Sequence, residues 1–529
     1  MSNNKKIIKK QLHEHYEILK NSHLSDLFSN DKNRGKHFTS KFHNLLIDYS
    51  KNHITDETLE LLLNYAKELD IKKSINGMFS GKEINVTEGC AVLHHALRAK
   101  PEKVLVLKDD EIIKEIKDEL KNIKRFVSLV HDKKLTGWTN KPFDTYVNIG
   151  IGGSDLGTKM VVNALNQYRE EKTRSFFISN IDGEQIELLK KTINPETTLF
   201  IISSKSFKTI ETTTNADVIK SWLLKSGCDD ISKHFVAVTS NFETAKDFGI
   251  GKENIFKTWN WVGGRFSLWS AVGLPVALAI GFENFEKMLL GAYKLDEHFL
   301  SEPLEKNIPI ILALIDYWYI NFYGAPTHAI IPYDESLHYF PSYLSQLFME
   351  SNGKSTDRSG NIVSHKTGAI VWGAIGTNSQ HSVSQLLHQG KHVVPIDFLA
   401  PLMKKGDQNH HELLLANCLA QSRALMQGEN NKKSFLNFDG NKPSTTILYN
   451  ELTPETLGSL LAIYEHRVFV QGLLLEINSF DQYGVELGKK VALDISKKLA
   501  NKEKNINTDS STQNLIDIYI KSKEKNSEN

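Results

Sequence analysis

One segment of the sequence combines hydroxyl groups, an ammonium and a helix start, which are groups that bind phosphate. Ser204, Lys205 and Ser206 lie between an apolar run and a helix expected to begin near Thr209. Free N–H groups at a helix start, hydroxyls and a lysine all bind phosphate oxygens. Serine and threonine are also usual helix caps, but caps alone rarely need so many hydroxyls beside a lysine. The segment predicts a phosphate-binding loop.

A glycine-rich segment, VNIGIGGSDLG at residues 147–157, raises the question of a nucleotide. The dinucleotide motif G-x-G-x-x-G fails because Asp155 stands at its sixth position. The P-loop motif fails because Thr158 stands where its lysine belongs. What remains is a turn at Gly153 and Ser154, which could hold a smaller phosphate or be a plain turn.

A glutamate in the segment PSYLSQLFMESNGKS is a candidate general base. Pro341 suits a first helical turn and Asn352–Gly353 suits the helix end. Gln346 and Glu350 are four residues apart, so they share one face near the negative end of this helix. That position disfavours the carboxylate anion and suits a general base. The commoner fate of such a residue is an ordinary solvated glutamate.

Arg265 is the candidate cation, in the segment WVGGRFSLWSAVG. The chain has only nine arginines, and this one lies between two glycines and an aromatic-apolar run. An arginine beside an apolar core must pair with an anion or point into a pocket. Taken alone, a buried salt bridge is the simpler explanation.

Two segments nearer the C-terminus supply further candidates. His381 follows a Thr-Asn-Ser cluster and is expected in a first helical turn, where the positive helix end favours the neutral imidazole. Gln482, Glu486 and Lys489 have i, i+4, i+7 spacing and are expected on one helical face. A lone histidine is more often structural, and Lys490 after Lys489 favours a solvated face.

No metal or cofactor is required by the sequence. The pairs His94–His95 and His410–His411 diverge by about 100° on a helix, and no HExxH motif accompanies them. The three cysteines lie far apart, which argues against disulfides and a structural zinc site and fits a reducing, cytoplasmic location.

Bulk composition excludes several classes of protein. The 529 residues carry a formal net charge of +1, so no global field recruits nucleic acid or a membrane surface. The N-terminus has no apolar region typical of a secretory signal. The apolar stretches 269–282 and 308–325 fit buried core better than a membrane span, because the first is short and the second contains Asp316. A soluble protein is expected.

The elements that must position these residues form an α/β fold. Short apolar runs alternate with helical stretches in two series, which predicts two doubly wound domains with mainly parallel sheets flanked by helices. Ligands in such sheets bind beyond the carboxyl ends of the strands. We expect an N-terminal helical region packing on the larger domain, a smaller domain, a larger domain and a C-terminal tail, at residues 1–105, 106–282, 283–499 and 500–529.

Several of these segments together resemble the glucose-6-phosphate isomerase (phosphoglucose isomerase) family. The two long matches are WVGGRFSLWSAVG and GLLLEINSFDQYGVELGK. NIGIGGSDLG, SSKSFKTIET, MESNGK, GTNSQHSVSQLLHQG and NHHELLLAN match in the same order. The resemblance spans roughly residues 75–495. It departs at Cys90, where many members have arginine, and at Ser206 and Lys208, where threonines are common.

The resemblance implies cofactor-free interconversion of glucose 6-phosphate and fructose 6-phosphate through a cis-enediol(ate), a step of glycolysis and gluconeogenesis. It implies Glu350 as the base, Arg265 as the stabiliser of the enediolate, and His381 and Lys489 as groups that assist ring opening. It also implies a cytoplasmic homodimer whose histidine crosses the interface. The implied substrate contacts are Ser204, Lys205, Ser206 and Thr209 for the phosphate and Gly153, Ser154, Gln346 and Gln482 for the sugar.

Two other functions are compatible with parts of the pattern. A bifunctional phosphoglucose/phosphomannose isomerase would share the fold, and activity on mannose 6-phosphate would reveal it. A sugar-phosphate-binding regulator would need the phosphate loop but no base. The presence of Glu350, His381, Lys489 and Arg265 together argues against the regulator.

Overall fold

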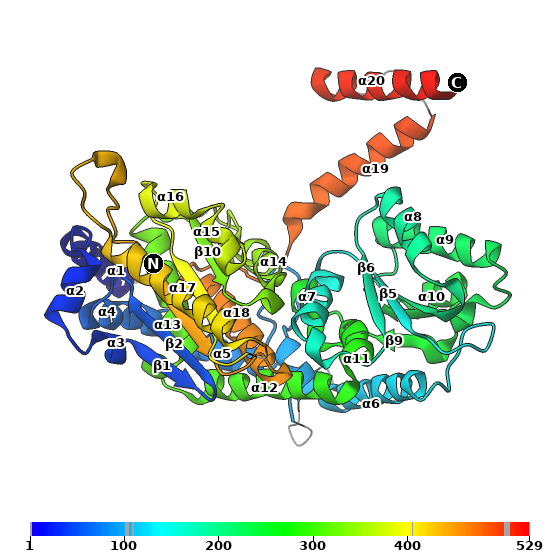
Figure 1. The fold of residues 1–529 in the computed structure, drawn as a ribbon, viewed down its shortest axis with the longest axis horizontal. Helices are drawn as coiled ribbons and strands as arrows, with labels where there is room; N and C mark the ends of the chain where they lie inside the picture. Colours follow the sequence, from blue (N-terminus) through cyan, green and yellow to red (C-terminus); the bar gives the residue numbers. More distant parts are fainter. Residues whose placement is uncertain (1–2, 101–104, 108–109, 405, 502–507, 528–529) are drawn as a thin grey trace. The chain divides into compact units, whose positions relative to one another are not determined.

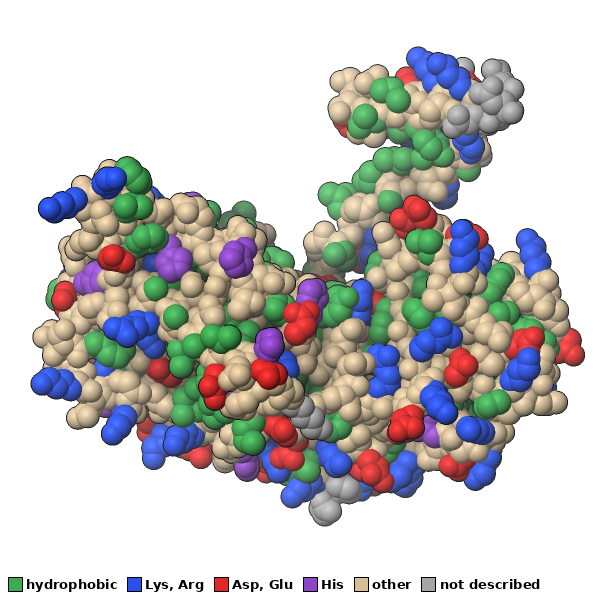
Figure 2. Space-filling view, viewed as in Figure 1, with side chains coloured by type: hydrophobic (Ala, Val, Ile, Leu, Met, Phe, Trp, Pro, Cys, Tyr) green, Lys and Arg blue, Asp and Glu red, His purple; other side chains and the backbone are tan. Residues whose placement is uncertain are grey.

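The computed structural model describes residues 3–100, 105–107, 110–404, 406–501 and 508–527. The chain divides into two units, Met1–Phe480 and Asp481–Asn529, and each is described by itself. The described helices include none that is long and apolar enough to cross a bilayer. On the face of the first unit seen in Figure 2, basic and acidic side chains are interspersed, in keeping with the net charge of +1.

The first sheet of unit 1 is entirely parallel. Its strand order is β6-β5-β7-β8-β9, with bounds Arg174–Ile178, Thr145–Ile149, Thr198–Ser203, Phe235–Thr239 and Ile255–Lys257. Every residue of β5, β7 and β8 is buried, as expected for parallel strands covered on both faces. Helices α8, α9 and α10 lie on one side of this sheet, and α7 and α11 lie on the other (Figure 1). These helices span Gly183–Thr192, Ile210–Lys225, Phe242–Phe248, Leu156–Ala164 and Leu274–Ile280.

The second sheet combines a parallel and an antiparallel part. Its order is β1-β2-β13-β12-β10-β11, with bounds Thr39–Phe42, Leu45–Lys51, Ser444–Tyr449, Ile396–Pro401, Thr327–Pro332 and Ile370–Gly373. Strands β13, β12, β10 and β11 are parallel, and β1 and β2 join them antiparallel. The two sheets and their flanking helices confirm the predicted α/β class.

The remaining helices of unit 1 pack around these sheets. Their bounds are α1 Asn3–Leu19, α2 Leu24–Asn30, α3 Arg34–His37, α4 Asp56–Glu68, α5 Ile71–Phe79, α6 Ile112–His131, α12 Phe282–Ser301, α13 Ile308–Asn321, α14 Phe340–Asn352, α15 Gly376–Gln380, α16 Ser384–Gln389, α17 Gln408–Gln427 and α18 Pro454–Leu474. A two-residue pair of strands, β3 (Val106–Leu107) and β4 (Asp110–Glu111), precedes α6. Helix α13 is buried from Ile308 to Ile320 and α11 throughout, so both long apolar stretches are core as predicted.

The N-terminal region is not wholly helical, which corrects the expectation for residues 1–105. Strands β1 and β2 occupy residues 39–51 of it. In β2 the buried residues Leu45, Ile47 and Tyr49 alternate with partly buried ones, a period of two that places one face on the core. The predicted division of the chain at residues 105, 282 and 499 stays a prediction.

Unit 2 consists of a short turn and two helices. The turn η12 (Tyr483–Val485) precedes α19 (Glu486–Asn501), and α20 spans Ser510–Ser527. The expected C-terminal tail therefore contains a regular helix.

Candidate active site

Two loops follow the carboxyl ends of the neighbouring strands β5 and β7, on the side of the sheet where the end of α14 lies. Gly150–Ser154 follows β5 and Ser204–Thr209 follows β7. A Cβ on Gly153 would lie 2.1 Å from the carbonyl carbon and oxygen of Gly264, so only glycine allows this close approach to the segment before Arg265. These loops therefore form the edge at which an open α/β sheet binds its ligands.

The glycine loop also lies against α14. Gly152 has a φ of +60°, a conformation that favours glycine. A Cβ built on it would be 3.3 Å from Nε2 of Gln346. Gln346 in turn donates a 2.9 Å hydrogen bond from Nε2 to Oε2 of Glu350. The glycine loop and the candidate base are thus joined through one glutamine.

Two buried side chains lock the ends of β5 and β7 together. Asn148 Nδ2 donates to the backbone oxygen of Ser154 at 2.9 Å, and Ser203 Oγ donates to Asn148 Oδ1 at 2.9 Å. This pairing fixes Ser154 beside the first residue of the predicted phosphate loop, Ser204.

The side chains of the predicted phosphate loop do not form an ordinary capped helix start. Thr209 is the N-cap residue of α9, yet its side chain makes no capping hydrogen bond. Its hydroxyl instead accepts from Ser204 Oγ at 3.2 Å. Ser206 Oγ accepts from the backbone N–H of Lys208 at 3.3 Å. The hydroxyls therefore gather at the first turn of α9 without capping it.

Lys205 bridges this loop to the arginine segment. Its Nζ donates to the backbone oxygens of Asn260 and Val262 at 3.0 and 3.2 Å. Its own carbonyl accepts from the hydroxyls of Thr239 and Ser240. The ammonium thus binds the chain leading to Gly263 and Gly264, a role that the sequence did not indicate.

Glu350 and Arg265 face one another. Nη1 of the arginine lies 3.8 Å from Oε2 of the glutamate. The Arg265 side chain is fully buried, whereas 23% of the Glu350 side chain is exposed. Glu350 is therefore not the fully solvated glutamate of the alternative interpretation. Its carboxylate can still be reached from solvent. A carboxylate beside a fixed guanidinium can accept a proton while the cation stabilises negative charge on the molecule that loses it.

Two residues that the sequence did not single out hold Arg265. Its Nε donates to Ser351 Oγ at 2.7 Å, and its Nη2 donates to the backbone oxygen of Ser479 at 2.6 Å. Both serines lie inside matched segments, but a serine carries no pattern of its own. Their role becomes visible only when the fold brings α14 and residue 479 together.

The local expectation for His381 is wrong. The helix begins earlier, at Gly376, so Thr377, Asn378 and Ser379 lie inside α15 and His381 is its C-cap residue. The early start follows from packing, since a Cβ on Gly376 would lie 2.5 Å from the Tyr333 ring and only glycine lets the chain turn there. His381 is exposed. His381 therefore does not lie in a first helical turn.

Gln482 and Lys489 belong to unit 2. Gln482 precedes the turn η12 and lies before α19, so it does not share a helical face with Glu486 and Lys489, which corrects the i, i+4, i+7 expectation. Gly484 fits this break, because glycine is unfavourable inside a helix that would otherwise run from Gln482 to Lys489. Lys489 is exposed and its Nζ donates to Glu486 Oε1 at 3.0 Å. Its role as an acid–base group stays a prediction.

The described residues contain no group of three or more His, Cys, Asp or Glu side chains that could hold a metal ion. The two histidine pairs have structural surroundings. His94 and His95 are buried, and burial lowers the pKa of His95 to about 4. His411 Nε2 bonds the backbone oxygen of Leu402, and His410 is exposed.

Fold and site together define an α/β protein that sets a carboxylate and an arginine beside two glycine- and hydroxyl-rich loops. A family model for phosphoglucose isomerase matches residues 48–516. The chain belongs to the phosphoglucose isomerase family. This result confirms the resemblance drawn from the sequence motifs.

Individual relatives agree over nearly the whole chain. A glucose-6-phosphate isomerase from Campylobacter jejuni subsp. doylei is 47% identical, with 96% of each chain covered. One from Wigglesworthia glossinidia brevipalpis is 49% identical with the same coverage. The crystal structure of a glucose-6-phosphate isomerase from Chlamydia trachomatis superposes with a TM-score of 0.88 at 33% identity, covering 97% of this chain and 98% of that one.

Proposed function

We propose that the chain is an aldose–ketose isomerase that interconverts glucose 6-phosphate and fructose 6-phosphate. The observation that carries the proposal is the pairing of a reachable Glu350 carboxylate with a buried Arg265 guanidinium 3.8 Å away. Family membership and the relatives named glucose-6-phosphate isomerase support the same reaction. They do not favour the bifunctional isomerase or the regulator.

The chemistry requires one base that can serve two neighbouring carbons. Glu350 removes the proton from C2 of the open-chain aldose and returns it to C1, through a cis-enediol(ate). Arg265 stabilises the negative charge that develops on the oxygens of this intermediate. General acid–base help of this kind contributes roughly 10²–10⁴-fold, and a preorganised cation or donor roughly 10²–10³-fold more.

The other predicted residues bind and orient the substrate. Ser204, Lys205, Ser206 and Thr209 bind the phosphate group, and Gly153, Ser154, Gln346 and Gln482 contact the sugar. His381 and Lys489 assist ring opening. The proposed enzyme needs no cofactor and works in the cytoplasm, in glycolysis and gluconeogenesis. It is a homodimer in which the exposed His381 of one protomer completes the site of its partner.

The reaction is tested with purified protein and glucose 6-phosphate in heavy water containing EDTA, followed by NMR. Fructose 6-phosphate that carries some deuterium at C1 is the expected result, because a carboxylate base exchanges part of its proton with solvent. If no product forms while the sugar-phosphate signals shift saturably, the protein binds the substrate without converting it and the proposal fails.

A further inference from the structure

The guanidinium of Arg265 is held by groups from two directions besides Glu350. Ser351 Oγ accepts from Nε at 2.7 Å, and the backbone oxygen of Ser479 accepts from Nη2 at 2.6 Å. Ser351 is fully buried and follows Glu350 directly in α14. The turn of helix that carries the base therefore also fixes one side of the cation.

The second support, residue 479, is itself fixed from α14. Ser479 Oγ donates to Asn352 Oδ1 at 2.7 Å. A Cβ on Gly472 of α18 would lie 1.8 Å from Ser479 Oγ and 3.1 Å from Asn352 Oδ1. Only glycine at position 472 leaves room for this serine. The segment that carries Ser479 therefore packs between the ends of α14 and α18.

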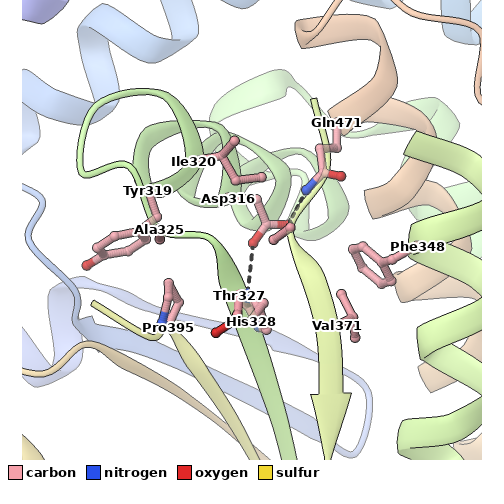
Figure 3. A pocket seen from close by; sticks show the side chains of 11 residues that line it. Asp316, Tyr319, Ile320, Ala325, Thr327, His328, Phe348, Val371, Pro395 and Gln471 are labelled. Carbon is pink, nitrogen blue, oxygen red and sulfur yellow. Dashed lines mark hydrogen bonds and ion pairs between the residues drawn. The ribbon is translucent and has the colours of Figure 1, made fainter. Parts of the chain in front are cut away.

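Asn352 is anchored in turn to the core of the molecule. Its Nδ2 donates to the backbone oxygen of Val468 at 3.0 Å and to Gln471 Oε1 at 2.6 Å. Gln471 Nε2 donates to Asp316 Oδ2 at 3.3 Å. In Figure 3 the Gln471 amide and His328 approach the Asp316 carboxylate from different sides.

Asp316 is the fixed end of this chain of contacts. Nε and Nη2 of Arg467 each donate to its carboxylate at 2.7 Å, and both residues are buried. A buried bidentate pair of this kind has a defined geometry. A rigid ion pair in the core is thereby connected to Arg265 through Gln471, Asn352 and Ser479.

We propose that Ser351, Asn352 and Ser479 are positioning residues for the isomerase reaction, which aim Arg265 at the charge that develops beside Glu350. This inference rests on the proposed function. Glu350, Ser351 and Asn352 are consecutive, so one helical turn sets both the base and, through two serines, the cation. A displacement of about 1 Å in such a group can cost on the order of 10²-fold in rate.

The same contacts in a merely structural role would affect folding alone, so the test must separate rate from stability. Ser351→Ala is introduced into the wild-type chain and into an Arg265→Lys chain, which lacks Nε and the forked guanidinium. We expect Ser351→Ala to lower kcat roughly 10- to 100-fold with KM within about 3-fold. In the Arg265→Lys chain the same change should cost less than about 3-fold, because the serine acts through the arginine.

Ser459→Ala is the matched control. Ser459 is buried in α18, and its Oγ donates to the backbone oxygen of Gly291 in α12 at 2.9 Å rather than to a group that holds Arg265. Its loss should lower the melting temperature and leave kcat unchanged. Ser351→Thr keeps the hydroxyl and should recover most of the lost turnover.

Two results would overturn the proposal: a kcat for Ser351→Ala equal to that of the control, or losses that multiply independently in the Arg265→Lys chain. If Ser351→Ala does not fold, Ser479→Ala enters the same cycle, since it removes only the hydroxyl that binds Asn352. A wild-type chain without turnover would instead reject the proposed reaction, so the two failures are distinguishable.

Discussion

At the scale of single residues, the site depends on one carboxylate placed between an amide and a guanidinium. Gln346 Nε2 and Arg265 Nη1 both approach Oε2 of Glu350, at 2.9 and 3.8 Å. These contacts orient the carboxylate without burying it. A base that must deliver a proton to either of two neighbouring carbons needs this kind of fixed but reachable position.

Replacing the base tests this arrangement most directly. Glu350→Gln keeps the shape of the side chain and its reach to Gln346, and removes the group that accepts the proton. We expect turnover of glucose 6-phosphate to fall by at least roughly 10²–10⁴-fold, with binding of fructose 6-phosphate nearly unchanged. Coupled turnover assays and calorimetry measure the two quantities.

The control for this change is Glu305→Gln, at an exposed glutamate in the turn before α13. It should keep wild-type turnover. Near-wild-type activity of Glu350→Gln itself would remove Glu350 from the mechanism.

At the scale of elements, the site exists because loops from one sheet meet a helix that packs beside the other. The glycine loop after β5 lies against Gly264, in the segment before Arg265, and against Gln346 of α14. The loop after β7 is tied to residues 260–262 by Lys205. A side chain at position 153 would prevent the first contact. A side chain shorter than lysine at position 205 would not reach the backbone oxygens of the second.

The phosphate loop can be tested through its lysine. In Lys205→Ala we expect affinity for fructose 6-phosphate to fall about tenfold to a hundredfold, the effect of losing a charged hydrogen-bond donor at the anion. The measurement is calorimetric titration in the Glu350→Gln background, where no turnover competes. Lys220→Ala is the control, because Lys220 Nζ also donates to a backbone oxygen, that of Phe248, but from the body of α9.

Equal affinities of the two lysine variants would show that Lys205 serves only as the tie to residues 260–262. In that case the phosphate would depend on the hydroxyls and on the N-terminus of α9. The comparison therefore separates the two roles that the geometry of Lys205 allows.

The strands that carry the site could be predicted from the sequence, because each is a short apolar run between turn residues. β5, β6, β7 and β8 in the first sheet and β10, β11 and β12 in the second all coincide with such runs. The same holds for α14, whose proline start and Asn-Gly end are local signals. Local patterns sufficed wherever the element was determined by its own residues.

The rest depended on contacts between distant parts of the chain. β2 becomes a strand by pairing with β13, some 400 residues away, and β1 joins the sheet by pairing with β2. Ser351 and Ser479 acquire their role only when Arg265 is folded between them. The start of α15 is set by the Tyr333 ring rather than by its own capping residues.

At the scale of the whole molecule, buried charged residues of α18 form ion pairs with residues of several other elements. Arg467 binds Asp316 of α13 and Asp397 of β12, while Glu465 binds Arg98 and the Trp269 indole. All these groups are buried. Removing one member would leave an uncompensated buried charge, which typically costs about 3–5 kcal/mol. The network therefore makes the folded core depend on protonation as well as on apolar packing.

Buried histidines make the stability of the fold depend on pH over a defined range. Burial lowers the pKa of His53 to about 4, helped by the neighbouring His23 and Arg34. Its ring nitrogens bond the Tyr319 hydroxyl and Asn441 Oδ1. Unfolded, a histidine titrates near pH 6.5, so between pH 6.5 and 4 the unfolded chain binds more protons than the folded one. His53 thus stabilises the fold above pH 6.5, and this contribution is lost as the pH falls toward 4, by up to about 3 kcal/mol.

The melting temperature should therefore decline as the pH is lowered from 6.5 to 4.5, and decline less steeply in His53→Gln, which cannot take up the proton. His410→Gln, at an exposed histidine, should keep the wild-type slope. Two of the buried carboxylates, Asp296 and Asp397, titrate below this window. Their partner cations lower the pKa values of Asp296 and Asp397, so the stability these two groups supply is lost only below about pH 4. A His53→Gln slope equal to that of the wild type would show that the acid sensitivity of the fold comes from other groups.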